Sequence, residues 1–132
     1  MKPYYSKEVI KRFTSPKNFG EIKNADAIGQ VGNPRCGDIM KLYLRLKKKG
    51  GQEVIEDIKF NTLGCAAAIA ASDMACDLVK GKTLKGALKI DYRKIIKELG
   101  DLPPIKIHCS VLAKEGLEAA VKDYEKRKNK KK

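Results

Sequence analysis

The sequence predicts one α+β domain in which a small antiparallel sheet of three strands is covered on one face by helices. After one short N-terminal helix, strand-like patterns fill the first half of the chain and helical patterns fill the second half. This order is typical of the class, because the apolar face of a sheet is buried by the apolar faces of helices. We place the domain at residues 1–125 and find no internal repeat or linker.

The strands are expected at residues 25–31, 38–47 and 54–62. The second of them alternates strictly, as a half-buried antiparallel strand does. We expect its core-facing side chains to be Met40, Leu42, Leu44 and Leu46, and its solvent-facing ones Lys41, Tyr43, Arg45 and Lys47. The polar run at 48–52 predicts a turn, so the last two strands form a hairpin.

The helices are expected from their caps and apolar stripes. Ser6 can cap the first helix, whose apolar face comprises Tyr5, Val9, Ile10 and Phe13. A long alanine-rich helix is expected from Cys65 to Lys80, and a last helix from about Ser110 to Tyr124. Two short helices fit between these long ones. Thr83 and Asp91 can each cap the start of one, and Gly100 can end the second.

The basic charge is concentrated at the end of the chain. The formal net charge is +13, and removing the six basic residues among the last seven positions leaves +7. We interpret residues 126–132 as a solvated, disordered tail. A nucleic-acid-binding module is not expected, since no helix-turn-helix, zinc-finger or RNA-recognition signature accompanies the charge.

Cysteine usage indicates a reducing compartment. The start of the chain lacks the apolar stretch of a secretory signal, so we expect the mature protein to begin at Met1 and to be cytoplasmic. No apolar run is long enough to span a membrane. In such a compartment, four cysteines indicate metal binding or catalysis rather than disulfides.

Three of the four cysteines lie where thiolate chemistry is favoured. Cys36 occupies a loop just before a strand, while Cys65 and Cys109 lie at the starts of expected helices. The positive end of a helix dipole lowers the pKa of a thiol and favours the thiolate, which binds metals and attacks sulfur. Cys76 lies roughly 16 Å along its helix from Cys65, and we interpret it as a small buried apolar residue.

Asp38 and His108 complete a donor set of five residues. Each is close in sequence to one of the three cysteines, and either can supply a fourth ligand. Three thiolates with an oxygen or nitrogen ligand suit an iron–sulfur cluster or zinc, between which the residues alone do not choose. A cysteine-nucleophile enzyme is disfavoured, because the neighbours His108 and Cys109 point in different directions at a helix start.

The segment from Leu102 to Lys106 contains two consecutive prolines, Pro103 and Pro104, followed by Ile105. Such a segment is extended and lacks two backbone donors. By chemistry alone it is a rigid connector between helices; the alternative is a docking peptide.

Taken together, three motifs resemble the IscU/NifU-type iron–sulfur cluster assembly scaffolds. They are VGNPRCGD at 31–38, FNTLGCAAAIAAS at 60–72 and LPPIKIHCS at 102–110. They occur in order, and the resemblance covers about residues 3–125. With His108 present and no insertion, the chain is similar to the IscU branch rather than the SufU-like branch.

The resemblance implies a carrier rather than an enzyme, with a transient [2Fe–2S] cluster built from iron and sulfur. By matching positions, Cys36, Cys65 and Cys109 would ligate the cluster, with Asp38 or His108 as fourth ligand. Asp38 would keep the cluster labile, and Cys109 would accept persulfide sulfur. Zinc can occupy the same donors, so a zinc-binding protein is the alternative.

The resemblance also implies partners. A cysteine desulfurase would supply sulfur, and apo-proteins such as ferredoxin would receive the cluster. The segment of Leu102, Pro103, Pro104, Ile105 and Lys106 would bind an Hsp70-type chaperone, which acts with a co-chaperone. We expect a monomer or dimer.

Overall fold

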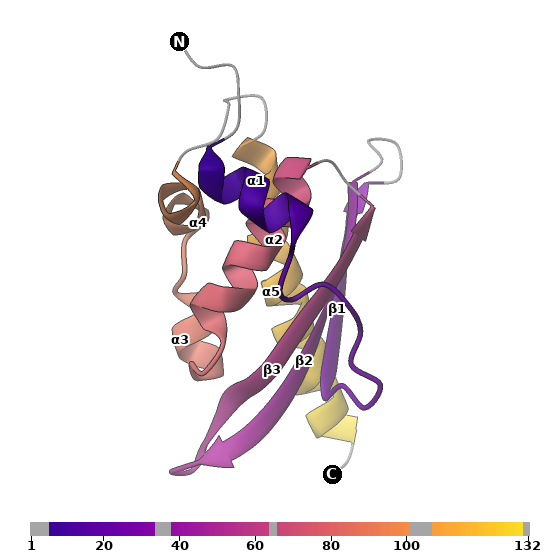
Figure 1. Cartoon of the computed structure of the whole chain (residues 1–132). Helices are drawn as coiled ribbons and strands as arrows, with labels where there is room; N and C mark the ends of the chain where they lie inside the picture. The colour runs from indigo at the N-terminus through magenta and orange to yellow at the C-terminus, as the bar shows by residue number, and fades with distance from the viewer. Residues whose placement is uncertain (1–5, 34–37, 64–65, 101–106, 131–132) are drawn as a thin grey trace.

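The computed structural model describes residues 6–33, 38–63, 66–100 and 107–130. The elements, in chain order, are α1 (Lys7–Thr14), β1 (Ala27–Asn33), β2 (Asp38–Lys49), β3 (Gln52–Leu63), α2 (Ala66–Val79), α3 (Leu84–Leu88), α4 (Tyr92–Leu99) and α5 (Ile107–Lys130) (Figure 1). The predicted α+β class is confirmed. Helix α5 continues beyond the expected end, so residues 126–130, which we expected to be disordered, are helical.

The sheet has the order β1-β2-β3, and both strand pairs are antiparallel. The expected hairpin between β2 and β3 turns at Gly50 and Gly51, whose φ angles are 60° and 81°. Two successive positive φ values match the right-handed twist of hairpin strands and are accessible to glycine at little cost. A bulge between Arg45 and Leu46 shifts the register toward this turn.

Helices α2 and α5 cover one face of the sheet. Met40, Leu42 and Ile58 project from this face and line the same small core space as Cys76 of α2 and Leu117 of α5. The expected inward alternation of β2 is therefore confirmed for Met40, Leu42 and Leu44, which are all buried. Burial of each such side chain contributes about 1.5–3 kcal/mol.

The opposite face of the sheet is partly covered by the segment between α1 and β1. This segment pairs with β3 where Gly20 N donates to Phe60 O (2.8 Å). It then crosses in front of the strands and reaches the start of β1, where Asp26 N donates to Leu44 O (2.7 Å) (Figure 1). Our assignment of Tyr43 to the solvent side was wrong, because Tyr43 is only 5% exposed on this covered face.

Helix α1 begins as expected but buries less apolar surface than expected. The Ser6 hydroxyl accepts a hydrogen bond from Val9 N (3.1 Å) and donates one to Leu99 O of α4. Val9 is buried, whereas Ile10 is 50% and Phe13 is 44% exposed. Tyr5 lies outside the described residues. The expected apolar face of α1 is thus reduced to Val9 among the described residues.

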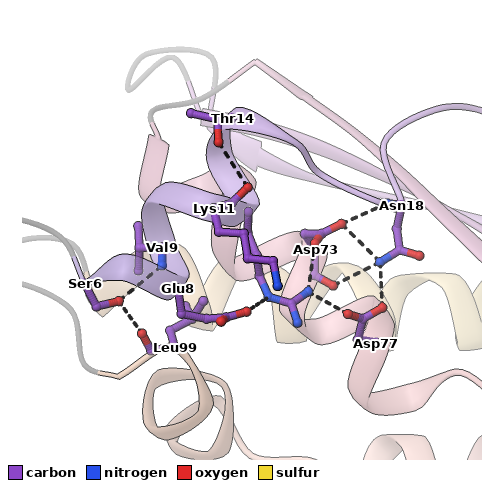
Figure 2. A network of polar contacts seen from close by, with 10 residues as sticks. Ser6, Glu8, Val9, Lys11, Thr14, Asn18, Asp73, Asp77 and Leu99 are labelled. Carbon is purple, nitrogen blue, oxygen red and sulfur yellow. Dashed lines mark hydrogen bonds and ion pairs between the residues drawn. The ribbon is translucent and has the colours of Figure 1, made fainter.

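A polar network supplies the remaining attachment of α1 to α2 (Figure 2). The Arg12 guanidinium lies 2.7 Å from a carboxylate oxygen of Asp73 and 2.7 Å from one of Asp77, and 2.8 Å from Glu8 within its own helix. From the segment after α1, Asn18 donates its backbone N–H to Asp73 (2.8 Å) and its side-chain amide to Asp73 and Asp77.

Burial makes this network consequential for stability. Asp73 is fully buried, and an ionised carboxylate without partners in such a place costs several kcal/mol. Burial alone would raise the pKa of Asp77, but hydrogen bonds from Asn18 and Arg12 hold that pKa below its ordinary value. Both acids therefore depend on Arg12 and Asn18, and the network ties α1 to the middle of α2.

Helix α5 packs against β1 at contact distance between backbones. An added Cβ at Gly29 of β1 would collide with the backbone N of Ala120 and lie 2.5 Å from Gly116 O. An added Cβ at Gly116 would collide with the methyl group of Met40, which is the end of a flexible side chain. The absence of side chains at these two positions lets the helix lie directly on the sheet.

Among the described residues, no helix is both long enough and apolar enough to cross a membrane.

Gly29→Ala is expected to destabilise the protein by about 3 kcal/mol, since backbone atoms of α5 must move to admit a methyl group. Gly116→Ala is the matched control and should change stability by less than about 1 kcal/mol, because Met40 can turn aside and alanine favours the helix. Urea unfolding of both variants checks this. Equal losses for the two would contradict backbone contact as the cause.

Arg12→Ala is expected to lower the free energy of unfolding by about 3 kcal/mol, because Asp73 would be left buried without its cation. Lys11→Ala, an exposed change in the same helix, is the control and should have a small effect. Thermal and urea unfolding measure both. If Arg12→Ala costs no more than Lys11→Ala, the network contributes no net stability.

Candidate metal site

Two of the segments that carry predicted ligands meet at one end of the sheet. The end of β1 pairs with the start of β2 at Asn33 and Asp38, and the chain between them contains Cys36. The next residue of β2, Ile39, pairs with Leu63 at the end of β3, two residues before Cys65. The strand register therefore brings the flanks of both cysteines together.

The start of α5 points to the same end. Along α5, Asp123 accepts a hydrogen bond from Ile28 N (2.8 Å), and Gly116 lies against Val31 further along β1. Helix and strand are thus antiparallel, so the first turn of α5 lies toward the end of the sheet where β1 finishes and β2 starts (Figure 1).

Helix α2 also starts at this end. Just after its last turn, Gly81 N donates to Ile55 O (2.9 Å) near the start of β3, while its first residue, Ala66, follows closely on the end of β3. Helix and strand are therefore antiparallel here too. Two helix N-termini and one strand hairpin converge, and each contributes a cysteine-bearing segment.

The structure describes only some of the predicted ligand residues. Asp38 is the first residue of β2, and His108 and Cys109 lie in the first turn of α5. Cys36, Cys65 and the segment Leu102–Lys106 lie outside the described residues, as do the side-chain positions of Asp38 and His108. Within the described part of the chain, no three His, Cys, Asp or Glu side chains group to hold a metal. The ligand set stays a prediction.

Cys109 has the side-chain position that bears most directly on the site. It is 1% exposed and belongs to the apolar core, although it lies at a helix start where we expected a thiolate. Ala113 and Leu117 follow at intervals of four on the same helix face, and both line the core with Met40. Since Met40 is two residues after Asp38, the Cys109 thiol faces the sheet near the start of β2.

Helix geometry makes this position suitable for a thiolate. Cys109 is the third residue of a 24-residue helix, where unpaired backbone N–H groups produce a positive potential. Next to it, the buried Ser110 hydroxyl donates to Ile107 O (2.7 Å), so this hydroxyl is already used within the helix. The helix N-terminus thus favours a thiolate that binds iron or accepts sulfur, whereas burial in apolar surroundings opposes it.

Cys76 is also buried, but it lies well inside α2 and not at a helix start. It is fully buried in the core, as we predicted for a small apolar residue. Burial raises its pKa well above the ordinary value, and the nearby carboxylates of Asp73 and Asp77 raise it further. Cys76 therefore stays a protonated thiol, which is a poor ligand and nucleophile.

The polar network of Figure 2 is the feature of the site's surroundings that sequence reasoning missed. The network holds α2, the helix that begins directly after Cys65, through contacts of Arg12 and Asn18 with Asp73 and Asp77. The sequence does hold a signal: Asp73 interrupts a run of small and apolar residues on a helix that is otherwise buried. Buried acids in such runs require partners elsewhere in the chain.

Comparison with known proteins agrees with this geometry. A protein of Archaeoglobus fulgidus named iron-sulfur cluster assembly scaffold protein IscU 1 is 50% identical over 120 residues, covering 91% of this chain and 76% of the relative. The scaffold protein IscU of Azotobacter vinelandii is 45% identical over 127 residues, covering 94% and 96%.

A solved structure has the same fold. The crystal structure of a candidate iron-sulfur cluster assembly scaffold protein for the SUF system from Fervidobacterium islandicum AW-1 matches with a TM-score of 0.70 and 27% identity, covering 89% of this chain and 96% of that one. Residues 4–131 match the family model of the NifU-like N terminal domain. This match spans nearly the whole chain, and the chain therefore belongs to the family of NifU-like N-terminal domains.

Proposed function

We propose that this protein is a scaffold on which an iron–sulfur cluster is assembled and from which it is transferred to other proteins. The observation that carries the proposal is the family match over residues 4–131, together with close relatives that are named cluster assembly scaffolds. The cluster is cargo, so the protein acts as a carrier and not as an enzyme.

The proposed ligands are Cys36, Cys65 and Cys109, with Asp38 or His108 as the fourth. The cargo is a [2Fe–2S] cluster, which cysteine thiolates hold well. The convergence of the β1–β2 hairpin, the start of α2 and the start of α5 supports this set, because each of these segments supplies one cysteine. The donor set also accepts zinc, so zinc in a purified sample would not contradict the proposal.

Sulfur enters, in this proposal, from the persulfide of a cysteine desulfurase. The Cys109 thiolate attacks the outer sulfur of that persulfide; a new S–S bond forms on Cys109, the S–S bond of the donor breaks, and the donor cysteine leaves as a thiolate. The position of Cys109 in the first turn of α5 supports this role.

The remaining partners follow from the same family. The segment Leu102–Lys106 binds an Hsp70-type chaperone that acts with a co-chaperone, and apo-proteins such as ferredoxin receive the cluster. A reducing cytoplasm keeps the thiols available. We expect a monomer or dimer.

Anaerobic reconstitution with ferrous iron, cysteine and a cysteine desulfurase tests the function and the ligand set together. We expect a visible absorption band and bound iron and sulfide for the native chain, and loss of stable cluster in Cys36→Ser, Cys65→Ser and Cys109→Ser. Cys76→Ala is the matched control and should keep the cluster, because alanine leaves no unpaired hydroxyl in the core.

Two results would contradict this. A cluster that survives all three serine substitutions, or is lost only in Cys76→Ala, would overturn the ligand set. If the native chain takes up no cluster and holds a zinc ion that iron does not displace, the protein is a zinc-binding protein instead.

Asp38→Ala is expected to slow cluster release, because a carboxylate oxygen is a weaker ligand for iron than a thiolate and its presence keeps the cluster labile. The rate of transfer to an apo-ferredoxin, followed by its visible spectrum, measures this. Glu56→Ala, an exposed carboxylate of β3, is the control. An unchanged rate in Asp38→Ala would remove this role from Asp38.

A further inference from the structure

Lysines gather at the end of the molecule opposite the candidate metal site. We define the basic pole as six exposed lysines near the β2–β3 turn, α3 and the end of α5: Lys47, Lys48, Lys49, Lys80, Lys85 and Lys128. The β2–β3 turn and the end of α5 lie at the end of the sheet opposite the last residues of β1, and the start of α3 lies beside the first residues of β3 (Figure 1).

Contacts within the pole show that these lysines are neighbours. Lys47, Lys49 and Lys80 line one hollow of about 290 Å³ between the hairpin and the end of α2. Lys85 lines a second hollow, of about 300 Å³, together with Glu53. Glu53 also pairs with Lys48 across the strands, and its carboxylate lies 3.5 Å from Lys128 Nζ.

The carboxylates in contact with the pole do not neutralise it. The Tyr124 hydroxyl lowers the pKa of Glu53; slight burial opposes this, and Lys128 and Lys48 lower the pKa further. Asp57 lies 3.7 Å from Lys80, and Glu56 lines the first hollow. Six lysines face three carboxylates, so the pole has an excess of positive charge even when all three are ionised.

The excess positive charge destabilises the folded protein by repulsion, and a partner of opposite charge would reduce this repulsion. Like charges held close together repel one another and destabilise the compact state. A cluster of them on a surface also raises the rate at which an acidic partner associates.

We infer that the basic pole is a docking surface for an acidic segment of another protein. Its Asp and Glu side chains would pair with the lysines. Of the apolar residues around the two hollows, Ile55 is fully buried and Val54 is 8% exposed, so charge pairing is the main attraction that the surface offers.

A protein fits this surface better than a nucleic acid does. The arginines near the pole are already engaged: Arg127 contacts Ala25 O and Asp123, and Arg45 donates to Asn24 O. Tyr124 directs its hydroxyl to Glu53. Among the described residues, the pole thus lacks the free arginine forks and stacking rings that favour phosphates and bases.

The position of the pole leaves the candidate metal site open. Strand β2 runs from Asp38 at the site to Lys49 at the pole. At about 3.3 Å per residue, the two ends are roughly 36 Å apart. A partner on the pole can therefore stay bound while another protein contacts the site, and the inference does not depend on cluster binding.

Fluorescence anisotropy with a labelled oligoglutamate peptide tests the inference on the full chain. The variant Lys47→Gln, Lys49→Gln, Lys85→Gln removes three charges from the pole. The matched control Lys7→Gln, Lys11→Gln, Lys97→Gln removes three charges from exposed positions of α1 and α4, so the two variants have the same net charge.

We expect the pole variant to bind oligoglutamate about tenfold or more weakly than the native chain, and the control to change affinity by less than about twofold. Added salt should weaken native binding, since exposed charges are screened. Melting curves confirm that both variants fold.

Two results would overturn the inference. Equal loss in both variants would mean that only net charge matters. If an oligothymidylate of equal charge binds the native chain more tightly than oligoglutamate and loses affinity in the pole variant, the surface is one for nucleic acid.

Discussion

The direct contact between α5 and β1 is the constraint on which the rest of the structure depends. Gly29 lies against the backbone of Ala120, so the helix has one available distance from the sheet. Gly116 lies against the side chains of Met40 and Val31, so the helix also lies close to β2. Since Cys109 is two turns before Gly116 on a rigid helix, these contacts also fix where its thiol lies relative to the start of β2. The position of the candidate ligand Cys109 thus depends on glycines that cannot themselves bind a metal.

Local signals predicted the elements well, because they act within a few residues. The caps Ser6, Thr83 and Asp91 each accept a backbone hydrogen bond at a helix start, and Gly100 adopts the left-handed conformation at a helix end. The predictions of burial failed where contacts with segments distant in the sequence determine whether a side chain is exposed. Tyr43 is buried by a segment that crosses from β3 to β1. Alternation within β2 holds no information about that crossing, so the sequence pattern alone assigned Tyr43 to solvent.

The candidate site was predictable in outline for a related reason. Cysteines at helix starts can be found from local patterns, and the strand register then brings their segments to one end. The burial of Cys109 was missed because we placed the start of the last helix at about Ser110, whereas it begins at Ile107 and puts Cys109 on the same face as Ala113 and Leu117. The partners of Asp73 were missed because Arg12 is 61 residues away in sequence. Pairing over such a separation depends on the fold.

The lysines of the basic pole are far from the cysteines of the candidate metal site. The basic pole lies roughly 36 Å from the start of β2, which is several times the Debye length of about 8 Å at physiological salt. Its lysines therefore have little influence on the thiols at the other end, where the helix starts of α2 and α5 lie near the cysteine-bearing segments. The reverse also holds: a partner attracted to the pole responds to the lysine field and not to whether a cluster is bound. Attraction of a partner and reactivity of the thiols can consequently be changed by substitution independently of each other.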